Sequence, residues 1–84
     1  MTTERNTFQL VIASVGETRF DGEAISVTLP GESGELTILP HHEPIVTTLK
    51  PGTITVRALH GESKKFKVES GVLEMSGNRA VVLL

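Results

Sequence analysis

Hydrophobic and polar residues alternate with a period of two along most of the chain, which is the pattern of β-strands with one face in a core. The alternation is clearest between residues 24 and 29 and is also present over residues 8–13 and 53–58. The apolar members of these three segments are Phe8, Leu10, Ile12, Ile25, Val27, Leu29, Ile54, Val56 and Ala58. We therefore expect these side chains to form the core.

Turn residues divide the pattern into short segments. Gly16 marks a turn and Gly22 a bend, whereas residues 60–63 connect two segments that we expect to form a hairpin. We interpret Ser70-Gly71 as a bulge, and Gly77-Asn78 as the turn before a final apolar strand over residues 80–84.

No helix is predicted anywhere in the chain. Glycine or proline recurs every few residues from Gly16 to Gly61, and the many threonines, valines and isoleucines favour strands over helices. Many short strands with frequent turns indicate an all-β fold. We predict a flattened antiparallel β-sandwich or barrel of about ten short strands, and residues 1–84 as a single domain.

Composition excludes several classes of protein. A net charge of −2 and a pI near 5.9 give no general attraction for nucleic acid or anionic lipid. The absence of cysteine excludes disulfides and thiolate chemistry. Residues 1–6 lack the apolar run of a secretion signal, and no segment approaches the roughly 18 apolar residues that span a bilayer. We expect a soluble protein with no direct insertion into lipid.

The stretch Val27–Gly52 contains all four prolines, two of the three histidines and a pair of close glutamates, Glu32 and Glu35. His41-His42-Glu43 carries potential metal ligands, but neighbouring side chains in extended backbone point to opposite faces, so we predict no metal site. Glu32 and Glu35 lack an apolar pocket or a neighbouring cation that would separate their pKa values. We therefore predict neither a cofactor nor catalytic residues here.

Three other patterns also have simpler structural explanations. Ser33 and Ser70 beside glycines are accounted for by turn chemistry rather than by a serine nucleophile. The loop Gly31–Gly34 lacks the lysine and the following helix of a phosphate site. The lysines of residues 64–67 have too few aromatic neighbours for a nucleic-acid surface and fit a solvated edge strand.

The central stretch resembles a known family. The pattern L-P-G-E-x-G-E-L-x-I-L-P-x-H-x-P, which begins at Leu29 and ends at Pro44, is similar to the signature of the ATP synthase epsilon subunit. Phe20-Asp21-Gly22 resembles that family's F-x-G, residues 47–52 its T-x-L-K-P-G, and residues 70–75 its S-G-G-x-x-E-V. The resemblance extends from Phe8 to Leu84.

The resemblance implies the N-terminal β-sandwich of a non-catalytic subunit in the rotating central stalk of an F-type ATP synthase. It implies two partners, the gamma subunit and the polar loops of the c-ring, and a role in coupling proton or sodium translocation to ATP synthesis. It also implies a peripheral position on the cytoplasmic face of the bacterial inner membrane, or the thylakoid or inner mitochondrial equivalent. The implied c-ring contacts are Glu32, Ser33, Gly34 and Glu35, and the implied gamma contacts are His42, Pro44, Ile45 and Thr47.

Two residues depart from the family pattern, because Thr37 and His41 stand where members usually carry glycine. We expect a stiffer or bulkier loop before His42. The sequence printed ends at Leu84, before the position of the C-terminal helical hairpin of most members. If no hairpin follows in the protein, we do not expect that hairpin's inhibitory or nucleotide-sensing functions. Where a hairpin would pack, the exposed side of the final strand is expected to be apolar.

A second function class stays open, namely a free-standing β-sandwich that binds a small ligand. Such a module requires a concave apolar pocket with a few convergent polar groups. Flat faces would argue against it.

Overall fold

The computed structural model describes residues 6–84, which form eight β-strands and no helix. The strands are β1 (Phe8–Ser14), β2 (Glu17–Gly31), β3 (Gly34–Ile38), β4 (Ile45–Leu49), β5 (Gly52–Ala58), β6 (Ser63–Val68), β7 (Gly71–Ser76) and β8 (Arg79–Leu83). The all-β prediction is therefore confirmed. Residues 1–5, part of the segment inspected for a secretion signal, lie outside the described residues.

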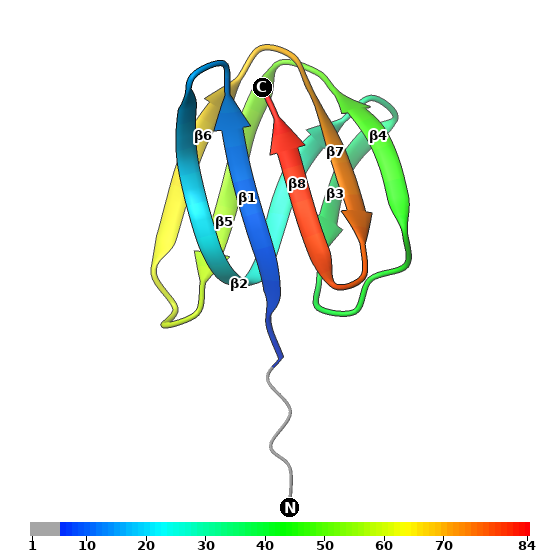
Figure 1. Cartoon of the computed structure of the whole chain (residues 1–84). Helices are drawn as coiled ribbons and strands as arrows, with labels where there is room; N and C mark the ends of the chain where they lie inside the picture. The colour runs from blue at the N-terminus through cyan, green and yellow to red at the C-terminus, as the bar shows by residue number, and fades with distance from the viewer. Residues whose placement is uncertain (1–5) are drawn as a thin grey trace, which may run out of the picture.

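The strands form two layers that face each other (Figure 1). One layer has the order β4-β7-β8-β1 and continues into the first half of β2, and the other contains β3, the second half of β2, β5 and β6. Strand β2 belongs to both layers because it is 15 residues long. The result is the flattened sandwich that the alternation predicts.

Two details differ from the prediction. The described residues contain eight strands rather than about ten, because Gly22 is a position inside β2 and not a bend between two strands. In addition, β1 and β8 pair in parallel, with Leu10 opposite Ala80. Parallel neighbours need a long connection, and these two strands are joined through the rest of the domain.

A bulge explains how β2 serves both layers. The register of β2 against β5 shifts between Ala24 and Ser26. Ala24 is buried before the shift and Val27 is buried after it, so the side facing the core changes from even to odd residue numbers. Ile25, which the alternation assigns to the core, is only half-buried. One extra residue in a strand bends it and increases its twist, which lets β2 pass from one layer to the other.

The core lies between the layers and contains every member of the predicted alternating set except Ile25, together with residues of β3, β7 and β8 that this set did not include. The fully buried large side chains are Phe8, Leu10, Ile12, Val27, Leu29, Ile38, Ile54, Val56, Leu73, Met75 and Val82. They come from both layers, so each strand contributes one face to the same cluster. The predicted hairpin of β5 and β6 is present, with Ile54 opposite Phe66. Residues 69 and 70 form the connection between the layers rather than a bulge.

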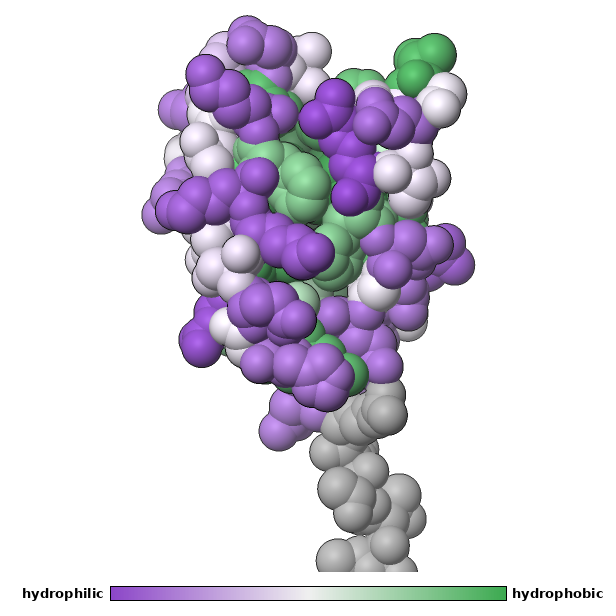
Figure 2. All heavy atoms as spheres, turned by 90° about the vertical axis from the view of Figure 1, so that its left-hand side faces the viewer, coloured by the Kyte–Doolittle hydropathy of each residue, from purple (hydrophilic) through white to green (hydrophobic). Residues whose placement is uncertain are grey.

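One side of the sandwich is closed by aromatic rings instead of by strand pairing. Phe20 of β2 and Phe66 of β6 meet edge to face, with ring centroids 6.4 Å apart at 74°. Both are partly buried and pack against the core. Figure 2 views the molecule from this side, where hydrophobic atoms are visible between polar side chains. The paired rings shield the core where β2 and β6 approach each other.

Among residues 6–84 there is no helix with the length and hydropathy needed to span a membrane.

Candidate functional site

The first predicted contact segment, Glu32–Glu35, forms the tight turn between β2 and β3. Gly31 pairs with Gly34 at the base of this turn, which leaves Glu32 and Ser33 at its tip. Glu32, Ser33 and Glu35 are exposed, and Gly34 is half-buried. The turn therefore presents two carboxylates to solvent at one end of the sandwich.

Neighbouring strands hold this turn in place. The Glu32 backbone N–H donates to the Thr48 carbonyl at 2.9 Å, and the Thr48 hydroxyl donates to Glu32 Oε1 at 3.1 Å. On the other side of the turn, the Lys50 N–H donates to the Pro30 carbonyl at 2.9 Å. These bonds connect the turn to the end of β4, so the Glu32 carboxylate has a fixed direction.

Glycine is required on both sides of the turn. A Cβ added at Gly31 would lie 2.4 Å from Leu36 Cδ2 and 2.8 Å from the Gly34 carbonyl oxygen. Gly34 itself has φ of 136°, a conformation that side chains disfavour. The glycines of the family pattern therefore have a steric and a conformational reason here.

The second predicted segment, from His42 to Thr47, begins in a turn after β3 and continues into β4. His42 N–H donates to the Leu39 carbonyl at 3.2 Å, and His41 between them has φ of 64°. With Pro40 in the first central position, this arrangement has the features of a type II turn. Glu43 and Pro44 are exposed, whereas His42, Ile45 and Thr47 are half-buried.

The His42 ring is oriented by the backbone carbonyl of the next residue. Nδ1 lies 2.7 Å from the Glu43 carbonyl oxygen. Because a carbonyl oxygen only accepts, Nδ1 carries the proton in this contact. In the neutral ring Nε2 is then an acceptor, so His42 can receive a hydrogen bond from a partner's donor.

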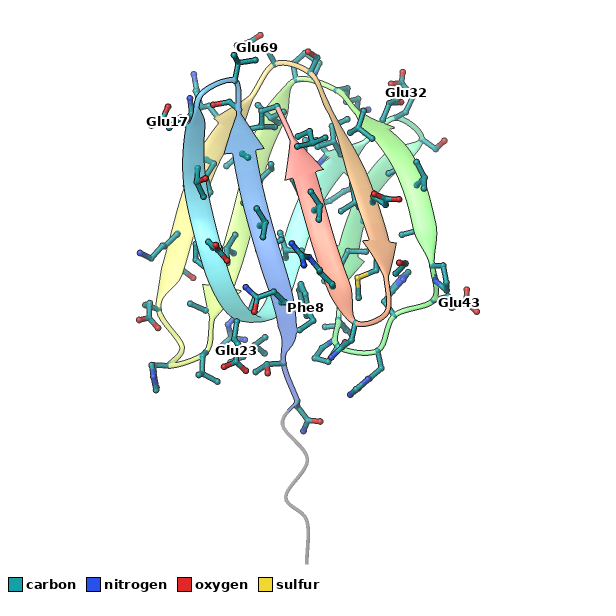
Figure 3. All side chains as sticks on the ribbon, viewed as in Figure 1. Phe8, Glu17, Glu23, Glu32, Glu43 and Glu69 are labelled. Atoms are coloured by element: carbon teal, nitrogen blue, oxygen red, sulfur yellow. The ribbon has the colours of Figure 1, made fainter. Side chains whose placement is uncertain are left out.

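The Glu32 turn and the turn that begins the second segment lie at opposite ends of the molecule. In Figure 3, Glu32 is at the end where β2 finishes, and Glu43 is at the other end beside the start of β4. Strand β3 connects the two turns, and its five residues span about 17 Å. The structure therefore separates the two turns, although β4 carries the second segment back toward the first, because Thr47 precedes the Thr48 that bonds to Glu32.

The two departures from the family pattern have different surroundings. Thr37 faces Thr28 across the β2–β3 pair, and their hydroxyl oxygens are 3.0 Å apart. A threonine pair of this kind stabilises neighbouring strands. His41 occupies the positive-φ position of its turn, and its N–H donates to Asn78 Oδ1 at 2.6 Å. The expected extra bulk is therefore accommodated in the sheet and at the turn.

The outer surface of one layer carries an apolar patch, which we call the aliphatic face. Its members are Val11, Ala13, Val46, Val72, Val81 and Leu83. The strand registers arrange this surface in two rows across the four strands, and Glu74 separates Val46 from the other members. From β1 to β4 the rows are Ala13, Leu83, Val72, Thr48 and Val11, Val81, Glu74, Val46. Val46, Val72 and Leu83 are 70%, 39% and 56% exposed. Exposed aliphatic side chains grouped in this way are typical of surfaces that contact another polypeptide.

The exposed side of the final strand is apolar at Val81 and Leu83, as expected, but carries the charged and exposed Arg79 at its start. The rest of the aliphatic face is not among the sequence-based expectations. A signal for it exists, because apolar residues occupy both sides of the alternation at residues 10–13 and 80–84. Strands that are apolar on both sides are typically covered on both faces.

The described residues contain no group of three or more His, Asp or Glu side chains that could hold a metal ion. A surface pocket of about 400 Å³ lies beside the β7–β8 turn and is lined by Thr7, Phe8, Gln9, Glu23, Gly77 and Asn78. Phe8 is its one apolar side chain, and that side chain is 1% exposed. The pocket therefore lacks the apolar walls that the ligand-binding hypothesis requires.

Comparison with known families agrees with this architecture. Residues 7–84 match the family model described as ATP synthase, Delta/Epsilon chain, beta-sandwich domain. The chain belongs to this family. The match begins just before β1 and includes all eight strands, so the resemblance drawn from the central stretch is confirmed for the whole sandwich.

Curated relatives carry the same family name. The chain is 42% identical over 78 residues to the ATP synthase epsilon chain of Delftia acidovorans, covering 93% of this chain and 56% of the relative. It is 46% identical over 78 residues to that of Bordetella avium, covering 92% and 55%. The chain thus spans about half the length of the curated relatives it matches.

Solved structures of two ATP synthases contain chains with the same fold. A chain in the mitochondrial ATP synthase of Euglena gracilis, with OSCP, F1 and c-ring, superposes with a TM-score of 0.88 at 18% identity, covering 98% of this chain and 52% of that one. A chain in the central stalk and c-ring of the Tetrahymena thermophila enzyme gives a TM-score of 0.76 at 17% identity, covering 96% and 65%.

Proposed function

We propose that this chain is the sandwich domain of a non-catalytic central-stalk subunit of an F-type ATP synthase. In this role it links the gamma subunit to the c-ring and couples ion translocation to ATP synthesis. The observation that carries the proposal is the family match over residues 7–84, together with two structured contact turns at opposite ends of the sandwich. A part that connects two partners needs two separate contact sites and a rigid body between them.

The structure supports rigidity in several ways. Most described residues are in strands, and side chains from both layers form one core. Prolines at positions 30, 40, 44 and 51 restrict the backbone of the contact segments and of the β4–β5 connection. Limited freedom before binding reduces the entropy that is lost on assembly.

Glu32, Ser33, Gly34 and Glu35 form the proposed c-ring contact. Their exposed carboxylates suit basic polar loops, with which they can make charge-assisted hydrogen bonds. The backbone bond from Glu32 to Thr48 holds the turn ready for this contact.

His42, Pro44, Ile45 and Thr47 form the proposed gamma contact. They combine the exposed ring of Pro44 and the half-buried Ile45, which also packs against the core, with a histidine whose Nε2 can accept a hydrogen bond. An apolar centre with polar groups at the rim is typical of protein interfaces.

The aliphatic face favours a subunit of a larger assembly over a free-standing ligand-binding module. Three exposed aliphatic side chains on one sheet face are unfavourable in water and become favourable when another polypeptide covers them. By the same proposal the subunit lies in the F1 part of the membrane-bound complex, on the cytoplasmic face in a bacterium, without inserting into lipid itself.

Site-directed cross-linking in the assembled ATP synthase tests the proposal. Because the chain has no cysteine, a single introduced cysteine carries the only photoreactive label. We expect Ser33→Cys to cross-link to the c-ring and Pro44→Cys to cross-link to gamma. Lys65→Cys, on the exposed outer side of β6, is the matched control and is expected to cross-link to neither.

The two labelled positions must give different partners. If Ser33→Cys and Pro44→Cys both cross-link to the same subunit, or to none in an assembled and active complex, the proposed linking role is wrong.

A further inference from the structure

Asn78 occupies the second position of the two-residue turn between β7 and β8. Gly77 and Asn78 both have φ of 58°, as a type I′ hairpin turn requires, and Ser76 pairs with Arg79 across it. Asparagine is one of the few residues other than glycine that adopts positive φ readily. The backbone alone therefore accounts for asparagine or glycine here, and the side chain is available for another task.

The Asn78 side chain connects two segments that are distant in sequence. Its Oδ1 accepts from the His41 N–H at 2.6 Å, and its Nδ2 donates to the Thr7 carbonyl at 2.9 Å. An N–H only donates and a carbonyl only accepts, so these partners fix the orientation of the amide. The Asn78 carbonyl also accepts from the Gln9 N–H at 3.2 Å. Asn78 thus ties the turn before β4 to the start of β1.

The bond to His41 meets a particular need. His41 has φ of 64° in a turn position where glycine is the favoured residue. A residue with a Cβ is disfavoured there, so the turn is less stable with histidine than with glycine. A short hydrogen bond to the His41 N–H favours the conformation that presents this group to Asn78.

We propose that Asn78 is the positioning residue of the gamma-contact turn. Its amide holds His41 in the left-handed conformation and thereby fixes where His42 and Pro44 lie relative to the sandwich. The inference rests on the proposed function, in which His42 and Pro44 contact gamma. It adds a residue that lies 37 positions from His41 in the sequence and acts through the His41 N–H.

The variant Asn78→Gly tests this role because glycine retains the positive φ of the β7–β8 turn and removes only the amide. We expect the hydrogen-exchange rate of the His41 amide, measured by NMR on the intact chain, to rise about tenfold. Affinity for gamma should fall about three- to tenfold, since the contact turn then samples other conformations. Thr37→Val, which removes the Thr28–Thr37 hydroxyl contact, is the matched control for a lost surface hydrogen bond.

A second substitution separates positioning from a loss of stability. In the double variant His41→Gly with Asn78→Gly, position 41 can adopt positive φ without strain. We expect gamma affinity to return to within about twofold of the wild-type value. A double variant that binds as weakly as Asn78→Gly would show that Asn78 does not act through the His41 conformation.

The two proposals fail in different ways. A wild-type chain that does not bind gamma contradicts the proposed function, whereas accelerated His41 exchange in Asn78→Gly would still support the positioning role. The positioning role is wrong if Asn78→Gly leaves the His41 exchange rate and the resonances of residues 41–44 unchanged, whether or not its affinity for gamma falls.

Discussion

Single residues at the two contact turns are constrained by contacts that the structure makes explicit. Gly31 lies against Leu36 and the Gly34 carbonyl, so the Glu32 turn closes without room for a side chain. Thr48 contacts both the backbone and the carboxylate of Glu32. At this scale, the direction of the Glu32 carboxylate depends on the residues packed around the turn.

Gly31→Ala should destabilise the domain. The added Cβ overlaps a side chain and a backbone oxygen, and a forced shift of this kind costs about 1–3 kcal/mol. Gly22→Ala is the control, because its nearest neighbours are at 3.8 Å and its φ is not positive. We expect a change within about 0.5 kcal/mol for the control. Urea denaturation of both variants measures the difference, and equal stabilities would contradict the steric argument.

Glu35→Arg should weaken assembly with the c-ring by about tenfold while leaving the free energy of unfolding nearly unchanged. Glu35 is exposed at the proposed ring contact, so its charge matters for binding more than for folding. Glu62→Arg has the same charge change in the exposed loop between β5 and β6 and should bind normally. If the unfolding midpoint of Glu35→Arg falls along with its c-ring affinity, the weaker assembly results from destabilised folding and not from a lost contact.

At the scale of elements, alternation predicted most of the core, and turn residues predicted where most strands end. Phe8, Leu10 and Ile12 are buried as predicted. Two predictions failed within β2. Ile25 is not in the core because the bulge next to Ala24 changes which side of the strand faces inward, and Gly22 is not a bend because it lies inside the strand. A bulge is fixed by pairing with β5, which the local sequence does not specify.

The Phe20–Phe66 contact is an element-scale feature because it joins β2 to β6 where these strands make no backbone ladder with each other. A double-mutant cycle with Phe20→Leu and Phe66→Leu should give a coupling energy of about 0.5–1.5 kcal/mol. Phe20→Leu combined with Thr37→Val, at the opposite edge of the sandwich, should be additive within about 0.5 kcal/mol. Equal coupling in both cycles would mean that the rings do not close this side.

At the scale of the whole molecule, the candidate site consists of separate surfaces on one rigid sandwich. The family pattern correctly located the two turns, because their prolines and glycines are local signals. Two features could not be predicted from local sequence. The aliphatic face is formed by four strands that the topology brings together, and the Asn78–His41 bond connects turns from opposite parts of the chain.

Binding to gamma tests the central claim most directly. Equimolar chain and purified gamma subunit from the same organism, mixed at micromolar concentration, are passed over a size-exclusion column. We expect the two to elute together as a 1:1 complex, and we expect Pro44→Arg to abolish co-elution while Lys65→Glu retains it. Separate elution of the wild-type chain and a folded gamma subunit would contradict the proposed role.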